Sequence, residues 1–210
     1  MEFDVARIVI GFTVLLLSLS FHEAAHAWSA DALGDPTARH LGRVSLNPIV
    51  HIDPIGTVLF PLVAMFTGLP LIGWAKPVPV NSANLHGNWQ QKFMMIAAAG
   101  PASNIVLAVI AAIGLRLIGW DGGATPATEQ IRIFLSMMVV LNVLLAVFNM
   151  LPIPPLDGGN VLMGLLRGRA SELFNSIRPF GMIVLYGLLI SGILWQIVGP
   201  VQDAILRTLL

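Results

Sequence analysis

Long apolar runs separated by short polar segments dominate the chain and predict several membrane-spanning helices. A helix needs about 20 apolar residues to cross the hydrocarbon core of a bilayer. Runs of about this length cover residues 8–30, 93–117, 131–150 and approximately 179–198. A fifth run, residues 55–72, is short and is interrupted by Pro61 and Pro70. We expect it to be re-entrant or irregular, because such backbone is tolerated at membrane depth only where protein or a water-filled cavity satisfies it.

Two polar connections carry patterns typical of extended backbone. Residues 42–46 predict a short strand that ends in a turn. Residues 78–81 continue a stretch with prolines at alternate positions, which indicates an edge strand or an extended loop. The predicted fold class is an all-α polytopic membrane protein with about four transmembrane helices, a re-entrant or irregular apolar segment and short membrane-associated β-strands. We expect residues 1–210 to form a single intramembrane domain, since the polar stretches are too short for an independent core.

The composition agrees with this interpretation. Apolar residues make up 56% of the sequence and charged residues only 10%, against about 25% charged in soluble domains. This indicates an integral protein of the lipid bilayer. Eleven basic residues balance eleven acidic ones, so the charge does not favour nucleic acid as a partner. The absence of cysteine excludes disulfides, a cysteine nucleophile and thiolate ligands, so a bound metal needs His, Asp or Glu side chains.

The first apolar run ends in a His-Glu-x-x-His motif formed by His22, Glu23 and His26. A helix turns by about 100° per residue, so the two histidines lie one turn apart on the same face and can share one metal ion. Glu23 is placed to reach a metal-bound water, as the general base does in zinc metalloproteases. The alternative is that the histidines bond to neighbouring membrane helices. An ionisable group at the centre of a membrane helix costs about 2.5–3.5 kcal/mol, so three of them in close sequence favour a shared divalent cation.

Other polar residues are candidates for the same site. Asp157 follows three prolines and precedes two glycines, so a rigid turn can present its carboxylate as a third ligand. The alternative role for Asp157 is the N-cap of a helix over residues 158–166. His51 and Asp53 lie just before the 55–72 segment. They either serve as turn and capping groups or approach the metal, where they would line a path for water or support the ligands.

Taken together, these motifs resemble the site-2 protease family of intramembrane zinc metalloproteases, peptidase family M50, over nearly the whole chain. The resemblance is carried by the His-Glu-x-x-His helix, by Gly-Pro-x-x-Asn at residues 100–104, and by Asn149 followed by Pro152 and Leu156-Asp157-Gly158. The resemblance is to a compact form of the family, which we expect to have no PDZ or CBS domain. We expect Asn104, in the second of these motifs, to serve helix packing.

The resemblance implies a catalytic site with a single metal ion. One Zn²⁺ would be bound by His22, His26 and Asp157, with Glu23 as the general base and Asn149 as a substrate-binding residue. The implied reaction is hydrolysis of a peptide bond in or near the transmembrane helix of a membrane protein substrate. The lack of regulatory domains leaves room for a regulatory partner protein. Two other classes stay open, a zinc-binding membrane transporter and a non-catalytic protein that binds membrane helices.

The distribution of basic residues predicts the orientation in the membrane. If the ends of the 8–30 and 131–150 helices meet at one metal, seven of the eleven Lys and Arg residues lie on that side. Cytoplasmic segments carry the excess of Lys and Arg in most membrane proteins. We therefore expect a multi-pass protein of the cell membrane (plasma or inner membrane), with the active site toward the cytoplasmic side.

Overall fold

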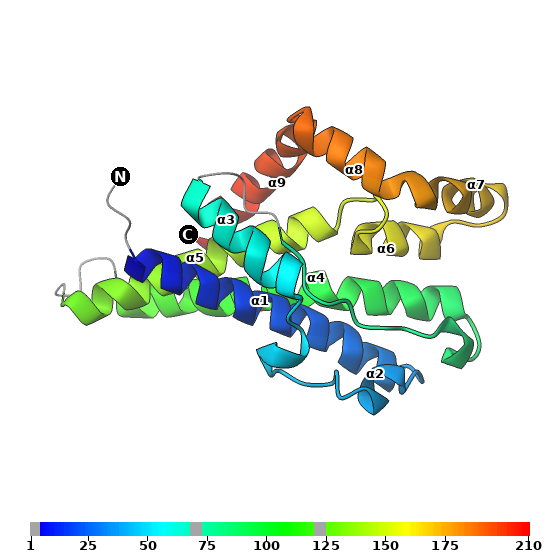
Figure 1. Ribbon diagram of the computed structural model, residues 1–210, viewed down its shortest axis with the longest axis horizontal. Coiled ribbons are helices and arrows are strands. Elements are labelled where there is room, and N and C mark those ends of the chain that lie inside the picture. The colour runs from blue at the N-terminus through cyan, green and yellow to red at the C-terminus, as the bar shows by residue number, and fades with distance from the viewer. Residues whose placement is uncertain (1–4, 68–72, 120–124) are drawn as a thin grey trace.

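The computed structural model describes residues 5–67, 73–119 and 125–210, and every regular element in these ranges is helical. The α-helices are α1 (Val5–Ala32), α2 (Thr37–His40), α3 (Phe60–Thr67), α4 (Trp89–Ile118), α5 (Pro126–Asn149), α6 (Asp157–Leu165), α7 (Arg169–Ile177), α8 (Gly181–Ile190) and α9 (Ile193–Leu209). The long helices α1, α4 and α5 run along the longest axis of the molecule and pack on one another (Figure 1). Helix α6 packs on α4, and α9 packs on α5.

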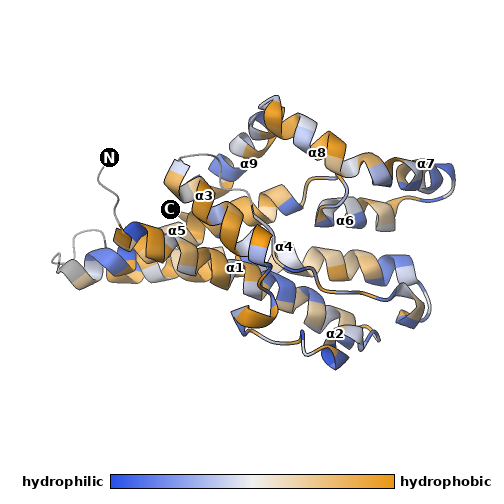
Figure 2. Ribbon diagram, viewed as in Figure 1, coloured by the Kyte–Doolittle hydropathy of each residue, from blue (hydrophilic) through white to orange (hydrophobic). Residues whose placement is uncertain are grey.

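Small and branched apolar side chains fill the centre of the bundle formed by α1, α4 and α5. Its buried residues are Val14, Ala108, Ala111, Ala112, Met138, Val139 and Val143. Alanines let helix backbones approach closely, which favours packing between membrane helices that have no hydrophobic driving force toward each other. Figure 2 shows hydrophobic residues along the bundle and hydrophilic residues concentrated in α2 and α7 near one end of it.

Within the described residues, four helical stretches are long and apolar enough to cross a membrane, so the chain is a multi-pass membrane protein. They are Val5–Ala32, Trp89–Ile118, Ala127–Asn149 and Arg169–Ile190. The first three match the predicted runs. The prediction of a last helix over residues 179–198 is wrong, because α8 ends at Ile190 and α9 begins at Ile193. Gly192 separates them with a φ of 75°, a left-handed conformation that glycine adopts readily and that often ends a helix.

The predicted β-strands are also wrong. The structure describes both stretches, and neither they nor any other described residue forms a strand. Residues 42–46 fold into turns, in which the N–H of Arg43 bonds back to the carbonyl of Ala38. Residues 73–81 are extended, but they form no ladder with another segment. Two of their N–H groups bond to single backbone carbonyls, and those of Val78 and Asn81 donate to the carboxylates of Glu23 and Asp35. Extended backbone without a partner strand makes no sheet.

The predicted irregular segment, residues 55–72, begins with a π-helical turn, Pro54–Leu59, followed by the short helix α3. Its last part, residues 68–72, lies outside the described residues. The start of the segment contacts the residues that follow its end. Trp74 N–H bonds to Gly56 O at 3.1 Å, and Lys76 N–H bonds to His51 O at 2.9 Å. The chain therefore enters and leaves this segment at the same level of the molecule.

Candidate active site

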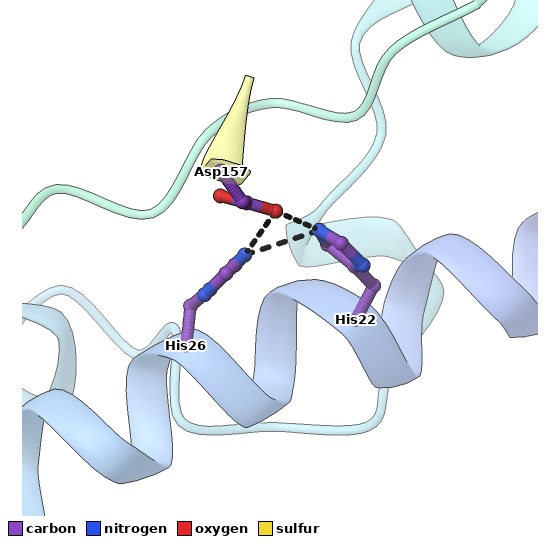
Figure 3. Close-up of side chains that lie close together, drawn as sticks. All are labelled: His22, His26 and Asp157. Carbon is purple, nitrogen blue, oxygen red and sulfur yellow. Dashed lines mark hydrogen bonds and ion pairs between the residues drawn. The ribbon is translucent and has the colours of Figure 1, made fainter. Parts of the chain in front are cut away.

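Helix α1 places the first three predicted site residues near the middle of the molecule. His22, Glu23 and His26 are 5%, 9% and 8% exposed. The two imidazole rings project from the same face of α1, and their Nε2 atoms lie 3.1 Å apart (Figure 3). The helical spacing of the motif thus brings both rings to one point, as the sequence predicts.

Asp157 reaches the same point from α6. Its Oδ2 lies 3.0 Å from His22 Nε2 and 3.3 Å from His26 Nε2 (Figure 3). Asp157 is the first residue of α6 and the N-cap position is occupied by Leu156, so Asp157 does not fill the N-cap role that was its alternative. The turn before it depends on glycine, because a Cβ on Gly158 would lie 2.3 Å from Met150 O. Gly158 therefore allows α6 to start against the end of α5.

The Nδ1 atoms of both rings are engaged with α4. His26 Nδ1 lies 2.8 Å from Ile96 O, and His22 Nδ1 lies 2.6 Å from Asn104 Oδ1. An oxygen of either kind only accepts, so each Nδ1 carries a proton, and in the neutral imidazole each Nε2 then presents a lone pair. Such a bond to the distal nitrogen fixes the tautomer and the ring orientation of a metal-binding histidine.

The converging atoms fit a metal ion. Two imidazole Nε2 atoms and a carboxylate oxygen face one another, and with both rings neutral these three acceptors favour a cation. Ligands about 2.0–2.1 Å from a tetrahedral zinc lie about 3.3 Å apart, close to the observed 3.0, 3.1 and 3.3 Å. Room for the group depends on Gly100 of α4, since a Cβ there would lie 2.4 Å from His26 Nε2. His22, His26 and Asp157 could thus hold one divalent ion.

Glu23 lies beside this group without belonging to it. Its Oε2 accepts a hydrogen bond of 3.0 Å from the backbone N–H of Val78, in the extended segment 73–81. Glu23, Val78 and the three converging residues line one cavity of about 450 Å³. A carboxylate held at the wall of this cavity is in position to exchange a proton with a molecule bound inside it.

Of the other predicted site residues, Asn149 lies at the cavity, whereas His51 and Asp53 do not line it. Asn149, the last residue of α5, lines the cavity, and its Nδ2 donates to Leu145 O at 2.9 Å. His51 is buried, and its Nε2 donates to Ser45 O at 2.8 Å. The Asp53 carboxylate accepts from the N–H groups of Ile55 and Gly56 and caps the π-helical turn. The contacts described for His51 and Asp53 are thus those of the turn-and-capping alternative.

Asp35 is a buried anchor for the extended segment that reaches Glu23. Its carboxylate accepts from Asn81 N–H at 2.6 Å, from Asn84 Nδ2 at 2.7 Å and from Thr37 N–H at 3.1 Å. Burial raises the pKa of the Asp35 carboxyl, but hydrogen bonds from the Thr37 hydroxyl, the Asn84 amide and these backbone groups outweigh it and leave the pKa below its ordinary value. Sequence analysis missed Asp35, because an Asp-Pro pair after a helix is also typical of an ordinary turn.

Known proteins with similar sequences show the family. Residues 117–191 match the family described as Peptidase family M50. The chain is 36% identical over 199 residues to the protein named "Putative zinc metalloprotease YwhC" of Bacillus subtilis strain 168, an alignment that covers 92% of this chain and 87% of the relative. The chain belongs to peptidase family M50. A second relative, "Putative zinc metalloprotease Rip2" of Mycolicibacterium smegmatis, is 30% identical over 178 residues, an alignment that covers 84% of this chain and 64% of the relative. No solved structure matches the chain.

Membership of the M50 family confirms the resemblance to site-2 proteases that the sequence motifs indicate. The chain is a zinc metalloprotease of this family, and its cofactor is one Zn²⁺. The compact form is consistent with the high coverage of YwhC. The part matched to the M50 family contains Asn149 and Asp157, whereas the His-Glu-x-x-His helix precedes it.

Proposed function

We propose that this M50 protease hydrolyses a peptide bond in or near the transmembrane helix of a membrane protein, with His22, His26 and Asp157 holding the zinc ion. The observation that carries the proposal is the convergence of two imidazole nitrogens and one carboxylate oxygen within 3.3 Å of one another beside Glu23 in one cavity. Three protein ligands leave a fourth position open, which is typical of catalytic rather than structural zinc.

Glu23 acts as the general base in this proposal. Bound zinc supplies a Lewis acid that lowers the pKa of a water molecule toward about 7 and polarises the substrate carbonyl. Glu23 accepts the proton of the attacking water at its carboxylate and delivers it to the leaving amine nitrogen. The Val78 N–H holds Oε2 at 3.0 Å, which orients the carboxylate at the wall of the cavity. Asn149, on another wall, binds the substrate near the scissile bond.

An apolar cavity next to the site supports a substrate that arrives from the membrane. It has a volume of about 370 Å³ and shares several wall residues with the cavity around Glu23, among them Trp74, Phe148 and Leu156. Its outer side is formed by apolar residues of α8, such as Leu185 and Leu189. A hydrophobic substrate segment can thus reach the polar site without crossing a charged surface. We place the site toward the cytoplasm of the cell membrane, on the positive-inside rule.

The test is cleavage of a co-expressed single-span reporter, with zinc measured on each purified protein. We expect the wild type to cut, and Glu23→Gln to keep its zinc and to lose cleavage. Glu172→Gln is the matched control, because Glu172 is exposed on α7, and we expect it to cut like the wild type. Cleavage by Glu23→Gln at the wild-type rate would contradict the base assignment. A wild type that holds zinc and cuts none of several membrane reporters, but cuts a soluble peptide, would contradict the proposed substrate class.

A further inference from the structure

A second group of buried polar side chains lies behind His22, deeper in the bundle. Ser18 on α1, Asn104 on α4 and Asn142 on α5 are each 0% exposed. Polar groups inside a membrane bundle are costly unless they bond to one another. They do so here: Asn142 Nδ2 donates to Ser18 Oγ at 2.8 Å, and Asn104 Nδ2 donates to Asn142 Oδ1 at 2.7 Å. Hydrogen bonds therefore join α1, α4 and α5, and through Asn104 they reach Nδ1 of His22.

The contact of Asn142 with a backbone carbonyl determines which atom donates and which accepts in each hydrogen bond of this group. Asn142 Nδ2 lies 2.8 Å from Met138 O, a carbonyl oxygen that only accepts, so the NH₂ of Asn142 must face it. Asn142 Oδ1 must then face Asn104, and only the NH₂ of Asn104 can donate to it. The same NH₂ donates to Ser18 O at 3.2 Å. Asn104 Oδ1 is thereby left to face His22 Nδ1.

We propose that Asn142 is a positioning residue, which acts through Asn104 to hold the proton of His22 on Nδ1 and the lone pair on Nε2. A reversed Asn104 amide would present its NH₂ to His22 Nδ1 and would favour the tautomer with the proton on Nε2. That tautomer has no lone pair to offer toward Asp157 and His26. This inference deepens the proposed function, since it rests on His22 as a zinc ligand.

The competing explanation is that Asn142 only holds the helices together. The two explanations differ in what they predict for the ring of His22. A residue that serves packing alone changes the stability of the fold when it is replaced. A positioning residue also changes the tautomer and the zinc affinity. Supporting partners of metal-binding histidines typically contribute 10–100-fold in metal affinity.

The experiment compares three variants of the full-length protein in detergent. Asn142→Leu removes the acceptor for Asn104 at similar volume. Asn142→Asp keeps an acceptor at that position. Val143→Ala is the packing control, because Val143 is equally buried on the same helix and makes only apolar contacts. The readouts are the ¹⁵N shifts of the His22 ring in metal-free protein, zinc affinity by chelator competition, and the thermal midpoint.

We expect Asn142→Leu to bind zinc about tenfold more weakly and to show His22 in both tautomers. Asn142→Asp should retain the Nδ1–H tautomer and wild-type affinity, and Val143→Ala should lower only the thermal midpoint. If Asn142→Leu lowers the midpoint but leaves tautomer and affinity unchanged, Asn142 serves packing alone and the inference is overturned. If Asn142→Leu does not accumulate, the His22 tautomer and the zinc affinity are measured on Asn142→Ala instead. His22→Ala separates the two proposals: undiminished zinc binding in that variant would contradict the proposed function, whereas the ¹⁵N shifts of the His22 ring in the Asn142 variants would still test the role of Asn142.

Discussion

The substitution Gly100→Ala tests the site with the least change to the chain. The added Cβ would lie 2.4 Å from His26 Nε2 and 2.7 Å from His22 Cε1. Nonbonded carbon contacts are optimal at about 3.5–4.0 Å, so the rings would have to retreat by about 1 Å. Binding sites lose function when their groups move by more than about 0.5 Å. We therefore expect at least a hundredfold loss of zinc affinity and no detectable cleavage.

The matched control is Gly114→Ala on the same helix. Its Cβ would meet only the end of the Leu135 side chain, at 3.2 Å, which can rotate away. Both substitutions replace a helical glycine and should each favour the helix by up to about 1 kcal/mol. The assays are zinc content, chelator competition, reporter cleavage and thermal unfolding. If Gly100→Ala binds zinc and cleaves like Gly114→Ala, the two histidine rings do not form the metal site in the way described here.

Three other predictions concern the substrate, the metal and the anchor of the extended segment. Asn149→Ala should weaken reporter cleavage while zinc content stays at the wild-type level, and loss of zinc in that variant would refute a role in substrate binding. Removal of zinc by a chelator should abolish cleavage, and added Zn²⁺ should restore it; cleavage that persists in metal-free protein would argue against a metalloprotease. Asp35→Asn should destabilise the fold by about 1–3 kcal/mol, since buried donors lose a charged acceptor. Because the pKa of Asp35 is lowered in the folded protein, its stabilising effect is present above the unfolded pKa of about 4 and is lost as the pH falls through the folded value. Thermal midpoints of wild type and Asp35→Asn should thus differ at pH 7 and converge in acid; a constant difference would refute the assignment.

The parts of the site that depend on one helix could be predicted from sequence, and the parts that depend on packing could not. The pairing of His22 with His26 follows from helix geometry alone. For Asn104 the sequence predicts only helix packing. The pattern of residues along α4 does not specify that Asn104 faces the ring of His22, which lies 82 positions away. The rigid turn and the family resemblance indicate Asp157 as a candidate ligand, but the local sequence also allows an N-cap, and only the packing of α6 against α4 brings its carboxylate to the two rings.

The errors in the fold have the same origin. The alternating prolines at residues 77 and 79 correctly indicate extended backbone, but a strand also needs a neighbour, and the sequence of one segment does not specify it. The last membrane helix was placed over an apolar run that includes Gly192. Hydropathy measures only how apolar a run is and does not report backbone conformation. The left-handed Gly192, which separates α8 from α9, therefore cannot be predicted from it.

The contact between Val78 and Glu23 also determines the alignment of the segment that carries it. Pro77 and Pro79 have no N–H, so Val78 is the one donor among three consecutive residues, and its backbone donates to the Glu23 carboxylate. A shift of the segment by one residue in either direction would present a proline to the carboxylate and leave it without this hydrogen bond. The flanking prolines thus fix the alignment of the segment against Glu23, because neither of them has an N–H that could replace that of Val78. Because the donor is backbone, the side chain at position 78 is free to vary, and an alanine scan of this segment would pass over the contact.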